Sequence, residues 1–346
     1  MAGAMANNTV QVHLTRTCNL SCAHCYSLSG PRERDSIDEQ AVMDFLTDAR
    51  SEGYDVVSFS GGEPLLYEGF ERLMRHARGL GMANTVVTNA TLMHGRDAQT
   101  LLPLMDLLAI SVDGPEEMHN RMRGSDTAFS RMRKGLAVAR QAGIPFGIIH
   151  TVTRESLPHL PELAKFAEAE GAELFQIHPL GLVGAAAHQQ DWLLDGETLT
   201  RTYLTGLALR AEYADRMRVH IDLFSRDAVR AMPHLVIPRE VAAGDRPKMA
   251  DVLNPLVLMT NGDVSPICHA MQPGFRMGNV HHARLPDLCT NYLSGPYDHL
   301  RSYCQMLWEQ VEDDDGWPYF NWYEMLESRS YRAPAQAALF GKPMAA

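Results

Sequence analysis

The chain has 346 residues, with 31 Lys and Arg against 42 Asp and Glu, so its formal net charge is −11. Hydrophobic residues make up 45% of it, which is far too many for a disordered chain and enough to bury a large core. The negative charge argues against nucleic-acid partners. No apolar run approaches the roughly 18 residues of a membrane span. Residues 1–8 lack the features of a signal peptide, and we expect a cytoplasmic protein with a flexible tail at residues 1–9.

Short apolar runs alternate with helical patterns along the first half of the chain. Such runs are typical of strands in a parallel sheet that helices cover. Six strand–helix units predict an α/β fold, a partial (β/α)6 TIM-like barrel over residues 10–180. The helix after the first strand is expected to begin at Ser36, with Glu39 completing a capping box, and a weak helical pattern covers Asp97–Leu104. The predicted strands are Val10–Thr15, Asp55–Ser60, Thr85–Thr88, Leu107–Val112, Phe146–His150 and Leu174–His178.

The alternation is expected to stop after His178. Residues 181–250 read as a connecting region with one helix over Glu197–Ala214 and one alternating strand over Val219–Phe224. A hairpin with an Asn-Gly turn at Asn261 then opens a smaller α+β domain over residues 251–346. Its aromatic tail, which includes Trp317 and Trp322, is expected to pack a terminal helix against the barrel.

Three cysteines, Cys18, Cys22 and Cys25, follow the first strand within eight residues. One loop can direct all three thiolates at a single inorganic centre. Structural zinc sites and iron–sulfur clusters usually have four protein ligands. A cluster with only three leaves one iron open, as a catalytic centre requires. The alternative is a zinc site completed by His24 or a distant residue.

The pattern C-x3-C-x2-C in this position resembles the radical SAM superfamily. The resemblance implies a [4Fe-4S] cluster on the three cysteines and S-adenosylmethionine (SAM) on the open iron. One electron, from a donor such as flavodoxin or ferredoxin, would cleave SAM to a 5′-deoxyadenosyl radical that abstracts a substrate hydrogen. Relatives usually carry an aromatic residue before the third cysteine, where this chain has His24 and we expect a cofactor contact.

Further motifs fall at the ends of the predicted strands, where barrel sites are built. Gly61-Gly62-Glu63-Pro64 resembles the family's GGEP motif, which implies contact of the backbone and of Glu63 with the SAM amino group. Independently of the family, two glycines let a backbone approach a ligand closely. Thr88-Asn89-Ala90 is similar to the family's Thr-Asn-Gly, with Ala90 in place of glycine.

The fourth strand ends in Ser111-Val112-Asp113-Gly114-Pro115, and Arg123-Gly124 follows. This resembles a block of radical SAM enzymes that modify peptides and cofactors. The resemblance implies that Ser111, Asp113 and Arg123 contact SAM, with Arg123 on its carboxylate, which a guanidinium matches bidentately. The alternatives are a surface salt bridge for Arg123 and a turn-initiating role for Asp113.

Two histidines at later strand ends, His150 and His178, are candidates for proton transfer because histidine titrates near neutrality. Packing at a strand end is the alternative for each. No other catalytic acid or base is identified.

The C-terminal third resembles the entry to a SPASM or twitch domain, with Cys268 followed by Gly278. The position where relatives carry the next cysteine is Ala283. Three cysteines are too few for two clusters, so at most one auxiliary cluster is expected. It would use Cys268, Cys289, Cys304 and a non-cysteine ligand; the alternative is a degenerate domain whose buried thiols behave as small hydrophobes.

We therefore expect a radical SAM enzyme that oxidises, crosslinks or epimerises a ribosomally made peptide. The alternative is a dehydrogenase, decarboxylase or epimerase of a small metabolite such as an antibiotic sugar. The start of the cysteine loop at residue 18 favours this alternative, because it leaves no room for an N-terminal peptide-recognition domain. Glu63 and Arg123 argue against a third possibility, a metal-binding module without catalysis.

Overall fold

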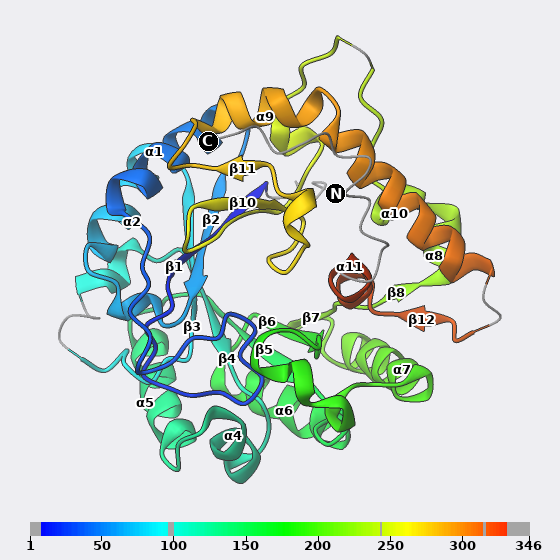
Figure 1. The fold of residues 1–346 in the computed structure, drawn as a ribbon. Helices are drawn as coiled ribbons and strands as arrows, with labels where there is room; N and C mark the ends of the chain where they lie inside the picture. The colour runs from blue at the N-terminus through cyan, green and yellow to red at the C-terminus, as the bar shows by residue number, and fades with distance from the viewer. Residues whose placement is uncertain (1–7, 96–99, 243, 314–315, 331–346) are drawn as a thin grey trace.

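The computed structural model describes residues 8–95, 100–242, 244–313 and 316–330. A ten-stranded sheet in the order β11-β10-β9-β1-β2-β3-β4-β5-β6-β7 curls through it (Figure 1). Its strands are β1 (Thr9–Thr15), β2 (Val56–Gly61), β3 (Ala83–Thr88), β4 (Leu107–Ser111), β5 (Phe146–Val152), β6 (Leu174–Pro179), β7 (Arg218–Ile221), β9 (Leu256–Leu258), β10 (Asp263–Pro266) and β11 (Gly278–Asn279). Two short strands, β8 (Phe224–Ser225) and β12 (Tyr319–Phe320), pair separately.

Strands β1 to β7 are all parallel. Their connecting helices lie on the outer face of the sheet (Figure 1). All six predicted strands are present, and the predicted α/β partial barrel is confirmed. The helices of this part are α1 (Glu39–Ser51), α2 (Phe70–Gly79), α4 (Glu116–Arg123), α5 (Ala128–Gln141), α6 (Leu160–Glu170) and α7 (Gly196–Glu212).

The alternation of helix and strand continues past β6, contrary to expectation. Helix α7 leads into β7, which pairs parallel with β6. Val219 and Ile221 in β7 are buried, whereas Arg218 and His220 are exposed. A strand covered on one face alternates in sequence, so β7 lacks the apolar run that identified the other parallel strands.

The first helix begins later than the sequence pattern indicates. Asp38 caps α1, and its side chain accepts a hydrogen bond from Ala41 N at 3.0 Å. Ser36, the expected cap, instead donates to the Thr15 hydroxyl at 2.7 Å. Part of the predicted helical stretch over Asp97–Leu104 lies outside the described residues; Leu102–Leu104 form a short 3-10 turn.

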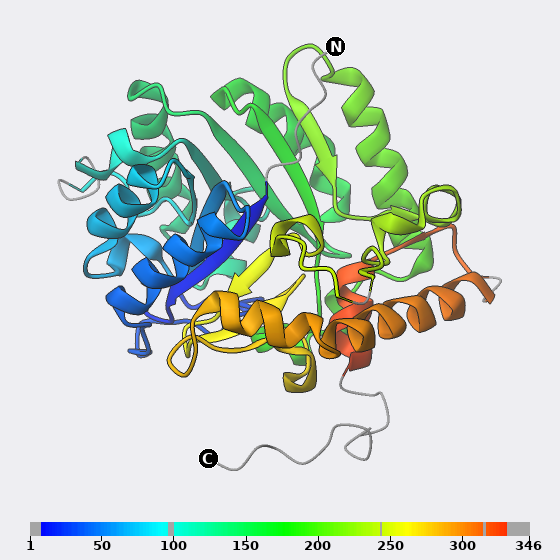
Figure 2. The ribbon, with the colours of Figure 1, turned by 90° about the horizontal axis from the view of Figure 1, so that it is seen from above.

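The predicted C-terminal hairpin is present as β9 and β10, and it joins the barrel sheet. Val10 of β1 pairs with Leu256 of β9 in parallel, and Figure 2 shows the yellow strands beside the blue β1. Arg284 binds the Asp48 carboxylate at 2.7 and 2.8 Å, which ties α9 to α1. The C-terminal helices are α8 (Arg226–Ala231), α9 (Leu285–Leu293), α10 (Pro296–Asp313) and α11 (Trp322–Ser330).

Most of the aromatic segment packs as predicted, but Trp317 is 53% exposed. Tyr319 stacks on Tyr203 of α7 with ring centroids 4.0 Å apart, and Trp322 is buried. Helix α11 is seen end-on within the ring of elements in Figure 1. Within the described part of the chain, no helix is both long and apolar enough to cross a membrane.

Candidate active site

The cysteine loop leaves β1 and is fixed by one bond across its own base and by two other parts of the fold. Gly30 and Arg16 close its base, since Gly30 N donates to Arg16 O at 3.0 Å. Ala23 N donates to Met122 O of α4 at 2.9 Å. Ala185 N, in the segment after β6, donates to Cys25 O at 2.8 Å. The sulfur-bearing loop is therefore held at the carboxyl ends of the parallel strands.

Each of the three sulfurs receives an N–H group. Ser29 N lies 3.3 Å from Cys25 Sγ. Asn89 Nδ2 lies 3.9 Å from Cys18 Sγ, and Arg123 Nη1 lies 3.9 Å from Cys22 Sγ. Hydrogen bonds to cysteine sulfur stabilise its anionic form and tune iron–sulfur centres.

Burial works in the opposite direction on two of the thiols. It raises the pKa of Cys18 to about 12 and also raises the pKa of Cys22. Thiols in such surroundings become thiolates when a cationic centre binds them. Three cysteine sulfurs on one short loop, each with its own N–H donor, fit a [4Fe-4S] cluster.

A single-ion site is not what the described residues build. They contain no group of three or more His, Cys, Asp or Glu side chains placed to hold one metal ion. His24, the fourth ligand considered for zinc, directs Nε2 at Asp113 Oδ2, 3.4 Å away.

The Gly61-Gly62 pair packs against the start of the cysteine loop. Gly62 N donates to Thr15 O at 2.6 Å, and Glu63 N donates to Thr17 O at 3.0 Å. A Cβ on Gly62 would lie 2.3 Å from Thr17 O, and one on Gly61 would lie 2.6 Å from Thr15 O. The sequence predicts that these glycines let the backbone approach a ligand closely. In the structure their lack of a side chain lets the backbone that leads into the cysteine loop pack against them.

Glu63 is fully buried and joins the ends of β2 and β3. Its carboxylate accepts hydrogen bonds from the Thr88 hydroxyl at 2.8 Å and from Asn89 N at 3.0 Å. Burial outweighs these bonds and raises the pKa of Glu63 to about 7. Ala90, in the place of the usual glycine, keeps a left-handed backbone with φ 57°.

Asp113 and Arg123 form a buried ion pair, with Arg123 Nε 2.5 Å from Asp113 Oδ2. Neither alternative from the sequence describes them, because the side chains are 0% and 10% exposed. Burial alone would raise the pKa of Asp113, but the charge of Arg123 outweighs it and holds that pKa well below its usual range.

Two buried polar atoms beside this pair, Asp113 Oδ1 and His24 Nδ1, have no hydrogen-bond partner among the described residues. Ser111, also expected to contact SAM, lies half-buried at the end of β4. Buried polar atoms normally have a partner. The unpartnered atoms next to the cysteine loop therefore fit a polar ligand such as SAM.

The two strand-end histidines, His150 and His178, differ in burial and in the partners of their ring nitrogens. His150 is fully buried, and its two ring nitrogens lie 3.0 Å from Val112 O and from Ser156 Oγ. No nitrogen of His150 is left for a substrate, which favours the packing alternative. His178 Nδ1 lies 2.8 Å from Asp222 Oδ2, and its side chain is 45% exposed.

Sequence reasoning missed Asp222, and it also missed His269 and Glu327. Asp222 directly follows β7, which was not assigned to the barrel, so its place at a barrel strand end was hidden. His269 Nδ1 lies 3.6 Å from Glu327 Oε1, and the His269 ring lies 4.2 Å from that of Tyr26. This contact between three distant segments leaves no local sequence signal.

The three C-terminal cysteines are buried, free thiols within the hydrophobic core. Cys289 lies on α9 and Cys304 on α10, and Cys268 lies in the segment after β10. Burial raises the pKa of all three, for Cys304 to about 12. These surroundings favour the degenerate-domain alternative.

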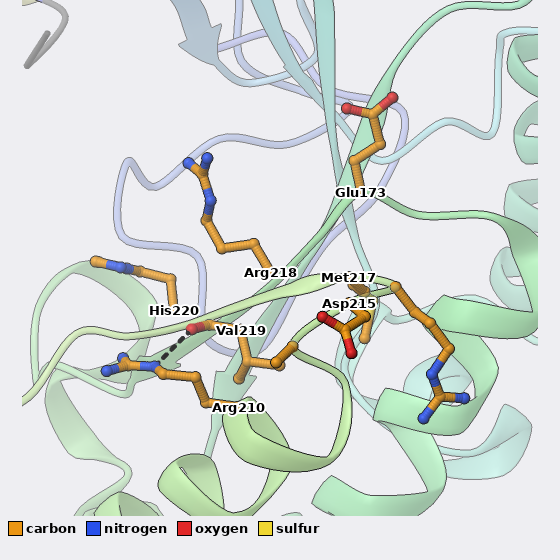
Figure 3. Close-up of a pocket in the computed structure, with 9 residues that line it drawn as sticks. Glu173, Arg210, Asp215, Met217, Arg218, Val219 and His220 are labelled. Carbon is orange, nitrogen blue, oxygen red and sulfur yellow. Dashed lines mark hydrogen bonds between the residues drawn. The ribbon is translucent and has the colours of Figure 1, made fainter. Parts of the chain in front are cut away.

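A cavity of about 790 Å³ lies elsewhere, at the opposite end of the sheet (Figure 3). Arg218 of β7 and Glu173, just before β6, line it with residues from the end of α7. Arg210 Nε donates to Val219 O there at 3.1 Å. Barrel active sites lie at the carboxyl ends of the strands, so this cavity is not part of the cysteine site.

Comparison with known proteins agrees with this geometry. Residues 12–167 match the model of the radical SAM superfamily. The chain contains a radical SAM domain. Homologues of the chain include enzymes of the SPASM/twitch-type subgroup.

Three relatives show how far the likeness extends. An AdoMet-dependent heme synthase of Oleidesulfovibrio alaskensis is 32% identical over 54% of this chain and 48% of its own. A cysteine-type anaerobic sulfatase-maturating enzyme of Clostridium perfringens is 32% identical over 46% of this chain and 48% of its own. The chain thus spans about half the length of the curated relatives it matches. Streptococcus suis SuiB, solved with its precursor peptide SuiA, superposes with a TM-score of 0.65 at 19% identity, over 85% of this chain and 66% of SuiB.

Proposed function

We propose that Cys18, Cys22 and Cys25 hold a [4Fe-4S] cluster and that the protein is a radical SAM enzyme. The observation that carries this proposal is the set of three cysteine sulfurs, each with its own N–H donor. When bound, the cluster supplies the electron that cleaves SAM to a 5′-deoxyadenosyl radical, which takes a hydrogen atom from the substrate. A small electron carrier such as flavodoxin or ferredoxin would reduce it.

The protein's own residues would position SAM around this centre. Glu63 would accept hydrogen bonds from the SAM ammonium, which favours the carboxylate form of Glu63. Arg123 would pair with the SAM carboxylate while Asp113 keeps the guanidinium in place. Ser111, Thr88, Asn89 and His24 would line the remaining surface, and the backbone of Gly61 and Gly62 would hold the loop.

We propose a ribosomally made peptide as the first substrate class. SuiB was solved with a precursor peptide, and a second relative is named a sulfatase-maturating enzyme. The modification would be an oxidation, a crosslink or an epimerisation. A small metabolite is the second candidate, supported by the relative that is named a heme synthase.

Electron paramagnetic resonance of the reconstituted, dithionite-reduced protein tests the cofactor site. We expect a [4Fe-4S]⁺ signal whose g-values change when SAM is added, because SAM would bind the open iron. Arg123→Met should require a higher SAM concentration for the same change. A cluster signal that SAM does not alter in the wild type would contradict the proposal.

A further inference from the structure

The ends of β6 and β7 hold a carboxylate between two imidazoles. Asp222 Oδ2 lies 2.8 Å from His178 Nδ1, and Asp222 Oδ1 lies 2.9 Å from His220 Nε2. Gln176 Nε2 also donates to Oδ2 at 2.6 Å. The Asp222 side chain is only 9% exposed, and these hydrogen bonds outweigh its burial to keep its pKa well below the usual range. Asp222 is therefore an anion that fixes its neighbours.

This arrangement determines which nitrogen of His178 is available. An ionised carboxylate only accepts hydrogen bonds, so Nδ1 carries the hydrogen that points at Asp222. No described residue bonds to Nε2, and the His178 side chain is nearly half exposed. The neutral ring thus presents an unshared electron pair on Nε2, as in other carboxylate–histidine dyads.

His178 lies at the same end of the sheet as the cysteine loop. The segment that follows it packs directly on that loop, since Ala185 N bonds to Cys25 O. A Cβ on Gly184 would lie 2.3 Å from Cys25 O and 2.4 Å from Tyr26 O. His178 itself touches none of the three cysteines in any interaction of the described residues. His178 therefore lies near the cysteine loop but does not contact the cysteines that would hold the cluster.

The groups that face His178 set its charge. Asp222, His220 and Gln176 belong to the barrel, whereas Glu327 comes from α11 and His269 from the segment after β10. Burial lowers the pKa of His178, but the Asp222 hydrogen bond and charge, with the charge of Glu327, raise it above the ordinary value. His269 stays neutral, because burial and the charges of His13 and His178 lower its pKa to about 3.

We propose that His178 exchanges a proton with the substrate, that Asp222 is its positioning residue, and that the substrate bears an O–H, N–H or S–H group on the carbon that loses hydrogen. This rests on the proposed radical function. The carbon-bound hydrogen leaves as an atom to the 5′-deoxyadenosyl radical and needs no base. A proton-transfer group is needed only for the hydrogen on the heteroatom, which leaves as a proton. In that step the heteroatom–H bond breaks and an N–H bond forms at Nε2. The electron left on the substrate radical would then pass to the small electron carrier of the proposed function in its oxidised form. The imidazolium that results is paired with the Asp222 carboxylate.

The first test uses diethyl pyrocarbonate, which modifies unprotonated imidazole, on the reconstituted holoenzyme with peptide mass spectrometry. We expect His178 to be modified and His150 to be protected. The modification rate of His178 should increase with pH, and the midpoint of that increase should lie at a higher pH than for an ordinary histidine. In Asp222→Asn the curve should move to lower pH. An unreactive His178, or a curve that Asp222→Asn leaves in place, would overturn the dyad.

The second test measures product formed per 5′-deoxyadenosine, with two probes in separate reactions. One probe is a pool of short peptides containing Ser, Thr and Cys, and the other is a pool of nucleotide-linked hexoses. We expect one pool to be modified, which identifies the source of the heteroatom. His178→Gln should lower the product per 5′-deoxyadenosine about 100-fold or more, as for loss of a general base. The control His159→Gln, a half-buried histidine that bonds to Glu162, should not.

The outcomes separate this inference from the function it rests on. No 5′-deoxyadenosine from the wild type would overturn the radical function. Normal 5′-deoxyadenosine with neither pool modified would overturn the substrate class. An unchanged product ratio in His178→Gln would overturn the role of His178.

Discussion

Arg123 and Asp113 form an ion pair inside the protein, with Nε 2.5 Å from Oδ2, and the same guanidinium reaches Cys22 Sγ at 3.9 Å. The pair thereby connects α4, the end of β4 and the cysteine loop. A guanidinium has five N–H donors in a fixed plane, so Arg123 can keep Asp113 and Cys22 and still offer donors to a ligand carboxylate.

Asp113→Asn should destabilise the protein strongly, because it leaves the Arg123 charge buried without its partner. Loss of one member of a buried pair costs about 3–5 kcal/mol. Arg121→Gln on the same helix is the matched control: its ion pair with Glu155 is exposed and should contribute less than about 1 kcal/mol. Urea unfolding of the metal-free chain gives both values. An equal loss of unfolding free energy in the two variants would show that the buried Asp113–Arg123 pair stabilises the protein no more than an exposed ion pair does.

Glu63 should make stability fall as pH rises. Its folded-state pKa of about 7 exceeds the ordinary value of 4.5, so the folded chain holds an extra proton between these values. The stabilisation is present below pH 4.5 and is lost as pH rises through about 7. The unfolding free energy of the wild type, taken relative to that of Glu63→Gln, should therefore fall across this window, whereas the partly exposed control Glu71→Gln should follow the wild type.

Other buried groups also contribute to the pH dependence of both proteins. Burial raises the pKa of Glu327 to about 7, which adds a loss of the same sign. Burial lowers the pKa of His150 to about 4, which adds a gain as pH rises. Unfolding in denaturant at several pH values measures this dependence. Because the contribution of such histidines rises with pH, the diagnostic quantity is the difference between the two proteins. An equal pH dependence of unfolding in the wild type and in Glu63→Gln would contradict the raised pKa of Glu63.

Gly62→Ala should disrupt the cysteine loop. Its Cβ would lie 2.3 Å from a backbone oxygen of Thr17, and backbone cannot move aside as a flexible side chain can. We expect reduced iron incorporation and a lower unfolding free energy. Gly79→Ala, with nothing within 4 Å of the new Cβ, should keep the iron of the wild type. Normal cluster content in Gly62→Ala would show that the loop tolerates displacement.

Replacing Cys18, Cys22 and Cys25 together by alanine should remove all the iron. The remaining thiols are buried in the hydrophobic core, and Cys289 and Cys304 lie on two different helices. Iron analysis after anaerobic reconstitution should give about four irons per wild-type chain and none in the variant. About four irons left in the variant would establish an auxiliary cluster.

The sequence was sufficient to predict strands β1 to β6, because each is a short apolar run next to a helical pattern. It was insufficient for β7, whose exposed Arg218 and His220 interrupt such a run. The cysteines and Glu63 could be found from local motifs. Asp222, His269 and Glu327 could not, since only folding brings them together. The role of Gly62 also needed the structure, because its neighbour Thr17 is remote in sequence.

The central claim is that the three-cysteine site cleaves SAM reductively. Chromatography of 5′-deoxyadenosine after anaerobic incubation of the reconstituted protein with SAM and dithionite tests it most directly. We predict 5′-deoxyadenosine from the wild type and none above background from Cys22→Ala. No 5′-deoxyadenosine from the wild type, or equal amounts from both proteins, would contradict the claim.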